Sequence, residues 1–193
     1  MVLTNFKYLV AEAPERCYGR NVMSQEMRKA IVDAHNKLRH NLAIGSVQRD
    51  AYHYDKRMPN ASNMRAMKYD CESEQKALLA IQQDDCEILK PRIAFEDLVR
   101  NYGYINTTLP LYRAVKFLKK ALVDMANADT EGVGCAVNFC SSSANNYYAV
   151  YCYYSAPHVE AGKGLYREGA PCSACPEGYQ CYDDSKLCRE KRF

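Results

Sequence analysis

The sequence predicts an α+β sandwich that ends in a small cysteine-rich segment. Apolar residues recur at helical spacing in the N-terminal part of the chain, and the pattern becomes β-like from Gly132 onward. Four of the ten cysteines then cluster near the C-terminus. Helices followed by an antiparallel hairpin are typical of α+β proteins. At 193 residues the chain is long enough for one domain with its own core and a small appendage.

The N-terminal region predicts an arm followed by a helix. Residues 1–22 lack periodicity, and we expect an extended arm anchored by Cys17. Ser24 can cap a helix that begins directly after it. Residues 41–62 are polar and rich in turn formers, which predicts a loop. The apolar face of this helix is formed by Met27, Ile31, Ala34, His35 and Leu38.

Two further helices are expected in the middle of the chain. The second is predicted over Tyr69–Cys86, where apolar residues again follow helical spacing. Residues 87–108 are mixed in character, with a short element expected around Ile93–Val99. A third helix should begin near Pro110, because proline suits the first helical turn.

Two β-strands complete the predicted sandwich. They are Val133–Phe139 and Tyr147–Tyr154, joined by the Ser- and Asn-rich residues 141–146. After Pro157 the composition shifts to Gly, Pro and Cys, with too few apolar residues for a core, so this segment predicts a disulfide knot or hinge. The predicted units are an arm at 1–22, a main domain at 23–157 and a cysteine-rich extension at 158–193.

The cysteine content predicts a disulfide-bonded protein. Ten cysteines are an even number and more than a reducing cytosol usually tolerates as thiols. Zinc is the alternative, but Cys172 and Cys175 form the only pair at metal-ligand spacing. Cys181 and Cys188 are poorly spaced to complete such a site, so we favour disulfides.

Other features agree with a secreted, extracellular location. Asn60-Ala-Ser and Asn106-Thr-Thr are N-glycosylation sequons, both in turn-like sequence. No stretch approaches the roughly 18 apolar residues of a membrane span. Residues 1–7 are not a signal peptide, since Lys7 interrupts a short apolar run, and we expect that a leader has been removed.

The charge distribution does not predict nucleic-acid binding. The formal net charge is only +3, and basic residues are scattered among acidic ones. A nucleic-acid surface needs a concentrated basic stripe with interleaved aromatic side chains. We therefore expect no nucleic-acid partner.

Several motifs, taken in order, resemble one protein family. The helix motif Ala34–Arg39 (AHNKLR) is similar to that of the CAP superfamily, also called SCP/TAPS. Segments ASNM at 61–64 and YDCE at 69–72 resemble its nematode branch, the Ancylostoma-secreted or venom allergen-like proteins. The remaining matches are Ala128–Thr130 with Val133–Val137, Tyr151–Ser155, and Gly164–Tyr166 with Gly169–Pro176.

The resemblance implies a three-layer α-β-α sandwich followed by a cysteine-rich hinge. It also implies how the cysteines pair. For the four hinge cysteines, three connectivities exist, and the interleaved one is favoured. The implied bridges are Cys17–Cys71, Cys86–Cys140, Cys135–Cys152, Cys172–Cys181 and Cys175–Cys188.

Many CAP domains hold a divalent metal with two histidines and two glutamates, and the resemblance implies that this site is degenerate here. The position of the first histidine is occupied by Lys90, a cationic donor that opposes metal binding. Glu96 is a plausible counterpart of the first glutamate. The positions of the second glutamate and second histidine fall at Lys120 and Ala121. We therefore expect no metal and no other cofactor.

The histidines of the chain do not suggest another catalytic site. His35 lies on the apolar face of the first helix, where a packed, hydrogen-bonded histidine is expected. His40 suits the negative end of the helix dipole. His53 and His158 lie in polar loops without partners at ligand spacing. No Ser/His/Asp or Cys/His triad is evident, which predicts that the chain is not an enzyme.

By resemblance, the expected function is that of a secreted parasite effector that binds a host protein. The target would be an immune or haemostatic protein, such as a leukocyte or platelet adhesion receptor. No Arg-Gly-Asp tripeptide is present, so the binding surface would be formed by loops such as 41–60, 100–110 and 141–146. The alternative is extracellular binding and transport of a sterol or fatty acid. Metal-dependent hydrolysis is the least favoured function.

Overall fold

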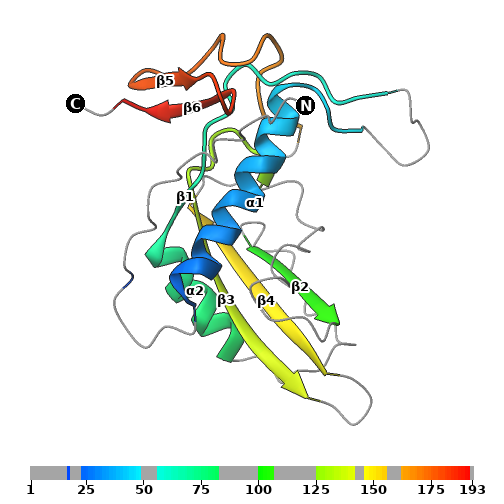
Figure 1. The fold of residues 1–193 in the computed structure, drawn as a ribbon, viewed down its shortest axis with the longest axis vertical. Coiled ribbons are helices and arrows are strands. Elements are labelled where there is room, and N and C mark those ends of the chain that lie inside the picture. The colour runs from blue at the N-terminus through cyan, green and yellow to red at the C-terminus, as the bar shows by residue number, and fades with distance from the viewer. Residues whose placement is uncertain are drawn as a thin grey trace, which may run out of the picture.

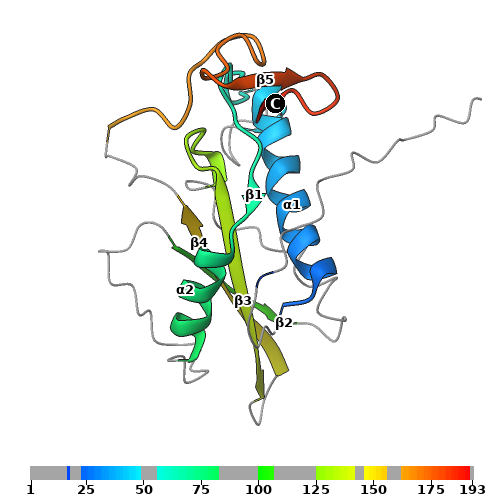
Figure 2. The same ribbon diagram turned by 90° about the vertical axis from the view of Figure 1, so that its left-hand side faces the viewer.

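The computed structural model describes residues 17, 23–48, 56–82, 100–106, 125–141, 146–155 and 162–191. In this part of the chain a four-stranded sheet of order β1-β3-β4-β2 lies between helices α1 and α2, which cover opposite faces (Figures 1 and 2). The predicted three-layer α+β sandwich is therefore confirmed. The bounds are α1 Gln25–Ala43, β1 Lys68–Tyr69, α2 Cys71–Gln82, β2 Arg100–Asn106, β3 Gly132–Ser141 and β4 Asn146–Ser155.

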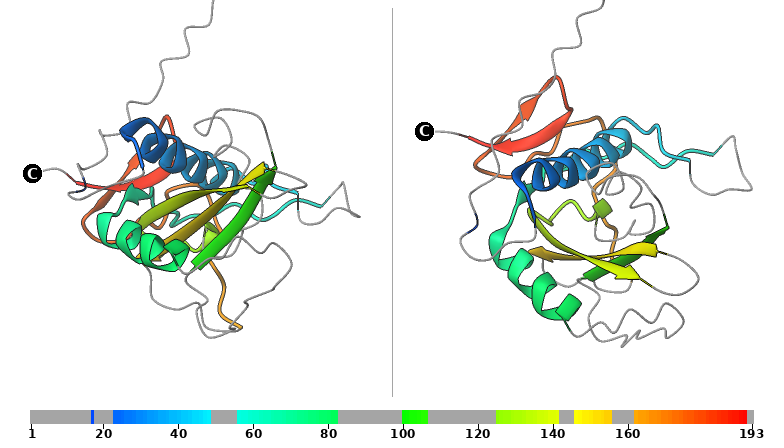
Figure 3. Two further views of the ribbon diagram at one scale, coloured as in Figure 1. Left: turned by 90° about the horizontal axis from the view of Figure 1, so that it is seen from below. Right: turned by 60° about the horizontal axis from the view of Figure 1, so that its bottom comes forward.

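Alternation along β3 assigns its side chains to the two helices. Val133 and Val137 pack in the cluster that contains α1 residues, whereas Ala136 packs with Ala77 of α2. At Gly134 an added Cβ would collide with the backbone nitrogen of Glu74, so only glycine lets α2 approach β3 this closely. Figure 3 shows the resulting layers from below.

Helix α1 begins where the sequence predicts. The Ser24 hydroxyl accepts a hydrogen bond from the backbone N–H of Met27 at 3.2 Å, which satisfies one free donor of the first turn. The helix extends to Ala43, into the region that was predicted to be a loop. Its buried stripe includes Ile31, His35 and Arg39, which lie one above another at four-residue spacing.

The predicted start of the second helix at Tyr69 is wrong. Tyr69 belongs to β1, which pairs in parallel with Val133 of β3. The Asp70 carboxylate accepts a hydrogen bond from the backbone N–H of Ser73 at 3.0 Å, so Asp70 is the N-cap and the helix begins at Cys71. The predicted end at Cys86 lies outside the described residues.

The β-hairpin is confirmed, and one predicted loop is a strand. Strands β3 and β4 pair antiparallel from Gly132↔Ser155 to Ser141↔Asn146. Residues 100–106, which were expected to be a loop, form β2 and pair antiparallel with β4. The third helix predicted near Pro110, and residues 142–145 at the hairpin tip, lie outside the described residues.

The C-terminal segment forms a second, two-stranded hairpin. Strands β5 (Tyr179–Tyr182) and β6 (Leu187–Glu190) pair antiparallel and lie beside the C-terminal end of α1 (Figure 1). Leu187 is fully buried in a cluster with Leu42 of α1 and with Met64. The hairpin therefore shares an apolar core with the sandwich and does not rely on disulfides alone.

Candidate functional site

The residues of the expected metal site cannot be located in the structure. Lys90, Glu96, Lys120 and Ala121 all lie outside the described residues. Within the described part of the chain, one group with ligand-like spacing is found, formed by Cys172, Cys175 and Cys188, whose sulfur atoms lie within 4.8 Å of one another. Each of these sulfurs belongs to a disulfide, so none is a free thiolate that could bind zinc.

His35 is packed and hydrogen-bonded, as predicted. Its side chain is 2% exposed, with Nδ1 2.7 Å from the carbonyl of Ile31 and Nε2 3.0 Å from the hydroxyl of Tyr154. Burial lowers the pKa of His35 to about 4, so the ring is neutral at physiological pH. Both ring nitrogens are engaged, which makes His35 a link between α1 and β4.

Arg39 is fully buried, and its guanidinium organises the loop that precedes β3. Desolvation lowers the pKa of Arg39 to about 9, so the group is still charged at neutral pH. A planar fork of donors suits several backbone carbonyls at once. The accepting carbonyls are those of Met125 at 2.8 Å, Arg65 at 2.7 Å, Thr130 at 2.8 Å and Asn127 at 2.5 Å.

A buried ion pair joins α1 to α2 around the β1 edge of the sheet. The Arg28 guanidinium donates to both oxygens of the Glu74 carboxylate at 2.8 and 2.9 Å. The Tyr69 hydroxyl donates to the same carboxylate at 2.6 Å, and burial raises the pKa of Tyr69. Glu74 is 0% exposed, so this bidentate pair is shielded from water and holds the two helices in register.

These buried polar groups maintain the fold and are not accessible to a substrate. Sequence reasoning found His35 but missed Arg39, Arg28 and Glu74. A signal for Arg39 was present, because Ile31, His35 and Arg39 recur every four residues on one helix face. No such signal marks the partner of Arg28, which lies 46 residues away.

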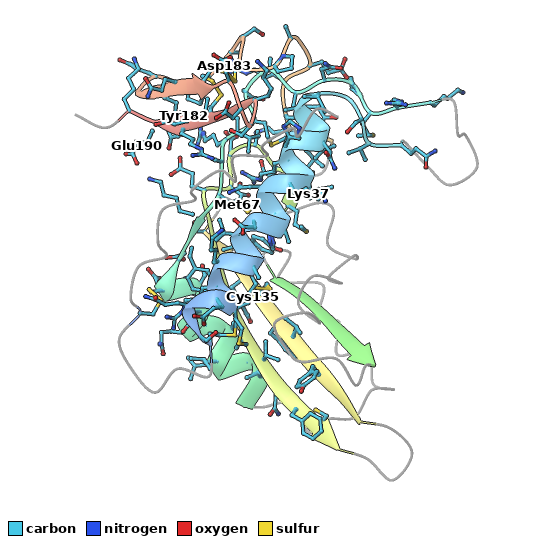
Figure 4. The ribbon with its side chains drawn as sticks, in the orientation of Figure 1. Lys37, Met67, Cys135, Tyr182, Asp183 and Glu190 are labelled. Carbon is cyan, nitrogen blue, oxygen red and sulfur yellow. A yellow bond between two sulfur atoms is a disulfide. The ribbon has the colours of Figure 1, made fainter. Side chains whose placement is uncertain are left out.

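Disulfides fasten the arm, the sheet and the C-terminal hairpin. The structure joins the pairs Cys17–Cys71, Cys135–Cys152, Cys172–Cys181 and Cys175–Cys188, which are pairs that the resemblance implies. Cys140 is also disulfide-bonded, and its expected partner Cys86 lies outside the described residues. In Figure 4, Cys135 lies in the sheet beneath α1, whereas Tyr182 lies in the hairpin at the other end of the molecule.

Charged and aromatic contacts fix the C-terminal hairpin to the sandwich. Arg65 pairs with Glu131 at 2.6 Å, and its guanidinium lies over the ring of Tyr179, 5.2 Å from the centroid. The Tyr179 hydroxyl donates to the same Glu131 carboxylate at 2.6 Å, and burial together with this contact raises the pKa of Tyr179 to about 12. The side chains of Lys68 and Glu190 form a further ion pair.

Loops beside the C-terminal end of α1 form a surface with exposed basic side chains. We call it the basic loop surface, and its described parts are residues 44–48, 56–60 and 162–170. Hydrogen bonds hold these loops together. The backbone N–H of Met58 donates to the carbonyl of Val47 at 2.8 Å, the Tyr166 hydroxyl donates to the carbonyl of Pro59 at 3.0 Å, and the backbone N–H of Gly169 donates to the carbonyl of Asn60 at 3.0 Å. The exposed basic residues are Lys56, Arg57, Lys163 and Arg167, and one exposed acidic residue, Glu168, lies among them.

The two predicted glycosylation sites differ in what the structure describes. Asn60 is exposed at the rim of the basic loop surface. Asn106 is the last residue of β2, opposite Tyr147, and its side chain lies outside the described part.

The architecture is that of a disulfide-bonded sandwich protein. An α-β-α sandwich with a docked cysteine-rich hairpin, fastened by disulfides, is a rigid scaffold suited to an oxidising compartment. In the described residues, no helix is both long and apolar enough to cross a bilayer.

The particular family follows from comparison with known proteins. A model of the cysteine-rich secretory protein family, CAP, matches residues 32–154, and the chain belongs to this family. Over 187 residues it is 27% identical to hookworm platelet inhibitor 1 of Ancylostoma caninum, covering 87% of this chain and 84% of that protein. The crystal structure of hookworm platelet inhibitor superimposes with a TM-score of 0.67 at 24% identity, covering 92% of this chain and 97% of that one. The resemblance to the CAP superfamily is thereby confirmed.

A second relative matches over a short stretch. Human peptidase inhibitor 16 is 41% identical over 58 residues, which is 28% of this chain. The match spans only 12% of the length of that relative, so it shows a shared segment of the domain.

Proposed function

We propose that this chain is a secreted, non-enzymatic parasite effector that binds a host protein. The target would be an immune or haemostatic protein, such as a leukocyte or platelet adhesion receptor. The observation that carries the proposal is the match to hookworm platelet inhibitor 1, a protein named for inhibition, along 87% of this chain. The disulfide-fastened scaffold supports it, since a rigid frame lets surface loops present a fixed binding shape.

The engagement of the buried ionisable groups supports a non-enzymatic role. A general acid or base must lie within hydrogen-bonding reach of a substrate. His35 instead uses both ring nitrogens inside the core. Glu74 accepts hydrogen bonds from Arg28 and Tyr69 while it is shielded from solvent. In the described residues these groups serve the fold.

The basic loop surface supports a partner with acidic side chains. Arg57 and Arg167 are exposed and project from segments that backbone contacts hold side by side. Charge complementarity of this kind raises the association rate and selects among partners. Ile44, 40% exposed at the C-cap of α1, adds apolar surface next to these charges.

Adhesion assays test the proposal. Glycosylated protein should inhibit the adhesion of platelets or leukocytes in a dose-dependent and salt-sensitive way. The double variant Arg57→Glu with Arg167→Glu should inhibit several-fold less. Lys37→Glu makes the same kind of charge reversal on the outer face of α1 and should inhibit like the unmodified protein. Absence of inhibition and of direct binding to purified adhesion receptors would contradict the proposal.

A chemical measurement distinguishes sterol or fatty-acid transport from binding of a host protein. Purified protein is extracted with organic solvent, and the extract is analysed by mass spectrometry. Recovery of sterol or fatty acid in stoichiometric amount would favour transport over protein binding. We expect none.

A further inference from the structure

We propose that the C-terminal hairpin carries a disulfide switch, in which a small thiol catalyses exchange between two connectivities of the same four cysteines. In the first form Cys172 is joined to Cys181 and Cys175 to Cys188. In the second form, Cys172 is joined to Cys175 and Cys181 to Cys188. Both forms contain two disulfides, so the interconversion involves no net oxidation or reduction.

The two bridges lie close enough to exchange. The sulfur of Cys172 lies within 4.8 Å of the sulfurs of both Cys175 and Cys188, which form the neighbouring bridge. Exchange requires a thiolate to approach a disulfide sulfur directly, and a small movement of one side chain closes this gap. A thiolate released at Cys172 therefore has the second bridge next to it.

The strand register provides the second pairing. Cys181 of β5 and Cys188 of β6 lie directly opposite each other in the hairpin. Cys135 and Cys152 occupy the same kind of opposed positions in β3 and β4, and they are joined by a disulfide. A bridge between Cys181 and Cys188 thus needs no change in strand pairing.

Exposure sets the order of attack. Cys181 is exposed, Cys172 and Cys175 are half-buried, and Cys188 is 0% exposed. A thiol from solvent therefore reaches the sulfur of Cys181 most readily and cannot reach the sulfur of Cys188. Cys172 also has a backbone φ of 63°, in the left-handed region that non-glycine residues rarely adopt, so opening its bridge frees the backbone to relax.

Three balanced exchange steps complete the switch. An external thiolate attacks Cys181, forms a mixed disulfide with it, and releases the Cys172 thiolate. The Cys172 thiolate attacks Cys175, which forms the Cys172–Cys175 bond and releases the Cys188 thiolate. The Cys188 thiolate attacks Cys181, which forms the Cys181–Cys188 bond and regenerates the external thiolate. Each step forms one S–S bond and breaks one.

The switch changes what the hinge bridges connect. In the first form both disulfides link the turn at 171–176 to the strands of the hairpin. In the second form one bridge closes within the turn and the other within the hairpin. No disulfide then links the turn to the rest of the protein. It is held in place by non-covalent contacts, such as the hydrogen bond from the backbone N–H of Ala174 to the carbonyl of Ser62 at 3.0 Å. The basic loop surface, whose residues 162–170 directly precede this turn, thereby loses a covalent constraint.

Peptide mapping distinguishes the two forms. The folded protein is incubated with a limiting amount of reduced glutathione, quenched with acid, and cut with trypsin and a glutamyl endopeptidase at mildly acidic pH. In the first form, fragments 169–177, 178–186 and 187–189 remain covalently joined. In the second form, fragment 169–177 separates with an internal disulfide, while the intact mass of the protein is unchanged. We expect this fragment to appear after thiol treatment and to be absent without it.

A matched variant tests the relay through Cys172. In the double variant Cys172→Ser with Cys181→Ser, the attacking sulfur is absent, so fragment 169–177 should stay joined to fragment 187–189 through Cys175–Cys188 after the same thiol treatment. If these two fragments separate equally fast in this variant, direct attack by the external thiol explains the opening of that bridge and the proposal fails. The proposal also fails if glutathione leaves all four cysteines of the unmodified protein closed, or if it opens them without releasing fragment 169–177.

Discussion

The imidazole Nε2 of His35 lies 3.0 Å from the hydroxyl of Tyr154, across the interface between α1 and β4. Its Nδ1 lies 2.7 Å from the carbonyl of Ile31. In the neutral ring, Nδ1–H donates to the carbonyl and Nε2 accepts from the hydroxyl. A second ring proton would remove that acceptor and place a charge in the core.

This arrangement predicts that acid destabilises the fold through His35. Burial lowers the pKa of His35 from 6.5 to about 4, so between these values the unfolded chain binds the proton more readily. Stability is thus fully present above pH 6.5 and falls as the pH drops toward 4, by up to about 3 kcal/mol. Urea unfolding at a series of pH values measures the change.

The variant His35→Gln isolates the histidine from the carboxyl groups that also titrate in acid. It should be less stable at neutral pH, but its stability should fall less steeply than that of the unmodified protein between pH 6.5 and 4.5. Parallel curves for the two proteins would show that protonation of His35 does not contribute.

Two glutamates of α2 predict responses of very different size to the same substitution. Glu74→Gln leaves the Arg28 guanidinium, 4% exposed, with an unpaired charge, and should cost about 3–5 kcal/mol of unfolding free energy. Glu72→Gln removes an exposed partner of Lys76, and its effect on unfolding free energy should be close to zero. Chemical denaturation compares them. Equal effects would mean that the Arg28–Glu74 pair contributes no more than a surface pair.

Local signals in the sequence predicted α1 and the β3–β4 hairpin because caps, periodicity and turn formers are short-range properties. The predicted start of α2 is wrong because Tyr69 continues the apolar pattern. In the structure its backbone belongs to β1, and its hydroxyl donates to Glu74. Contacts between residues far apart in the chain leave no local pattern in the sequence. Arg39 binds carbonyls that lie 26 to 91 residues away, and that pairing depends on the whole fold.

The docking of the hairpin was missed for a related reason. The segment after Pro157 has too few apolar residues for its own core, which favoured a separate knot. Leu187 instead enters a core formed by α1 and residues around Met64. One buried leucine is enough when the rest of the cluster comes from elsewhere in the chain.

The exposure of Asn60 predicts that a glycan is attached within the basic loop surface. Its side chain is exposed, and the sequon Asn60-Ala-Ser is intact. Protein secreted from eukaryotic cells should carry a glycan there, and peptide N-glycosidase should convert Asn60 to aspartate, which mass spectrometry detects. Asn60→Gln should lower the intact mass by one glycan. An unmodified Asn60 in protein that carries a glycan at Asn106 would contradict the prediction.

The burial of Leu187 predicts that this side chain contributes substantially to the stability of the docked hairpin. Leu187→Ala empties a fully buried site between Leu42 and Met64, and should cost about 2–5 kcal/mol, since the lost contacts leave a cavity. Leu79→Ala makes the same change on α2 at a side chain that is 63% exposed, and should be close to neutral. Unfolding by denaturant measures both.

Limited proteolysis shows whether the loss is local to the hairpin. Cleavage after Lys186, in the turn between β5 and β6, should accelerate in Leu187→Ala and stay unchanged in Leu79→Ala. The hinge disulfides remain in both variants, so faster cleavage would report loss of apolar docking. If the two variants were cleaved and unfolded alike, the hairpin would be held by its disulfides and ion pairs, and the shared core would contribute little.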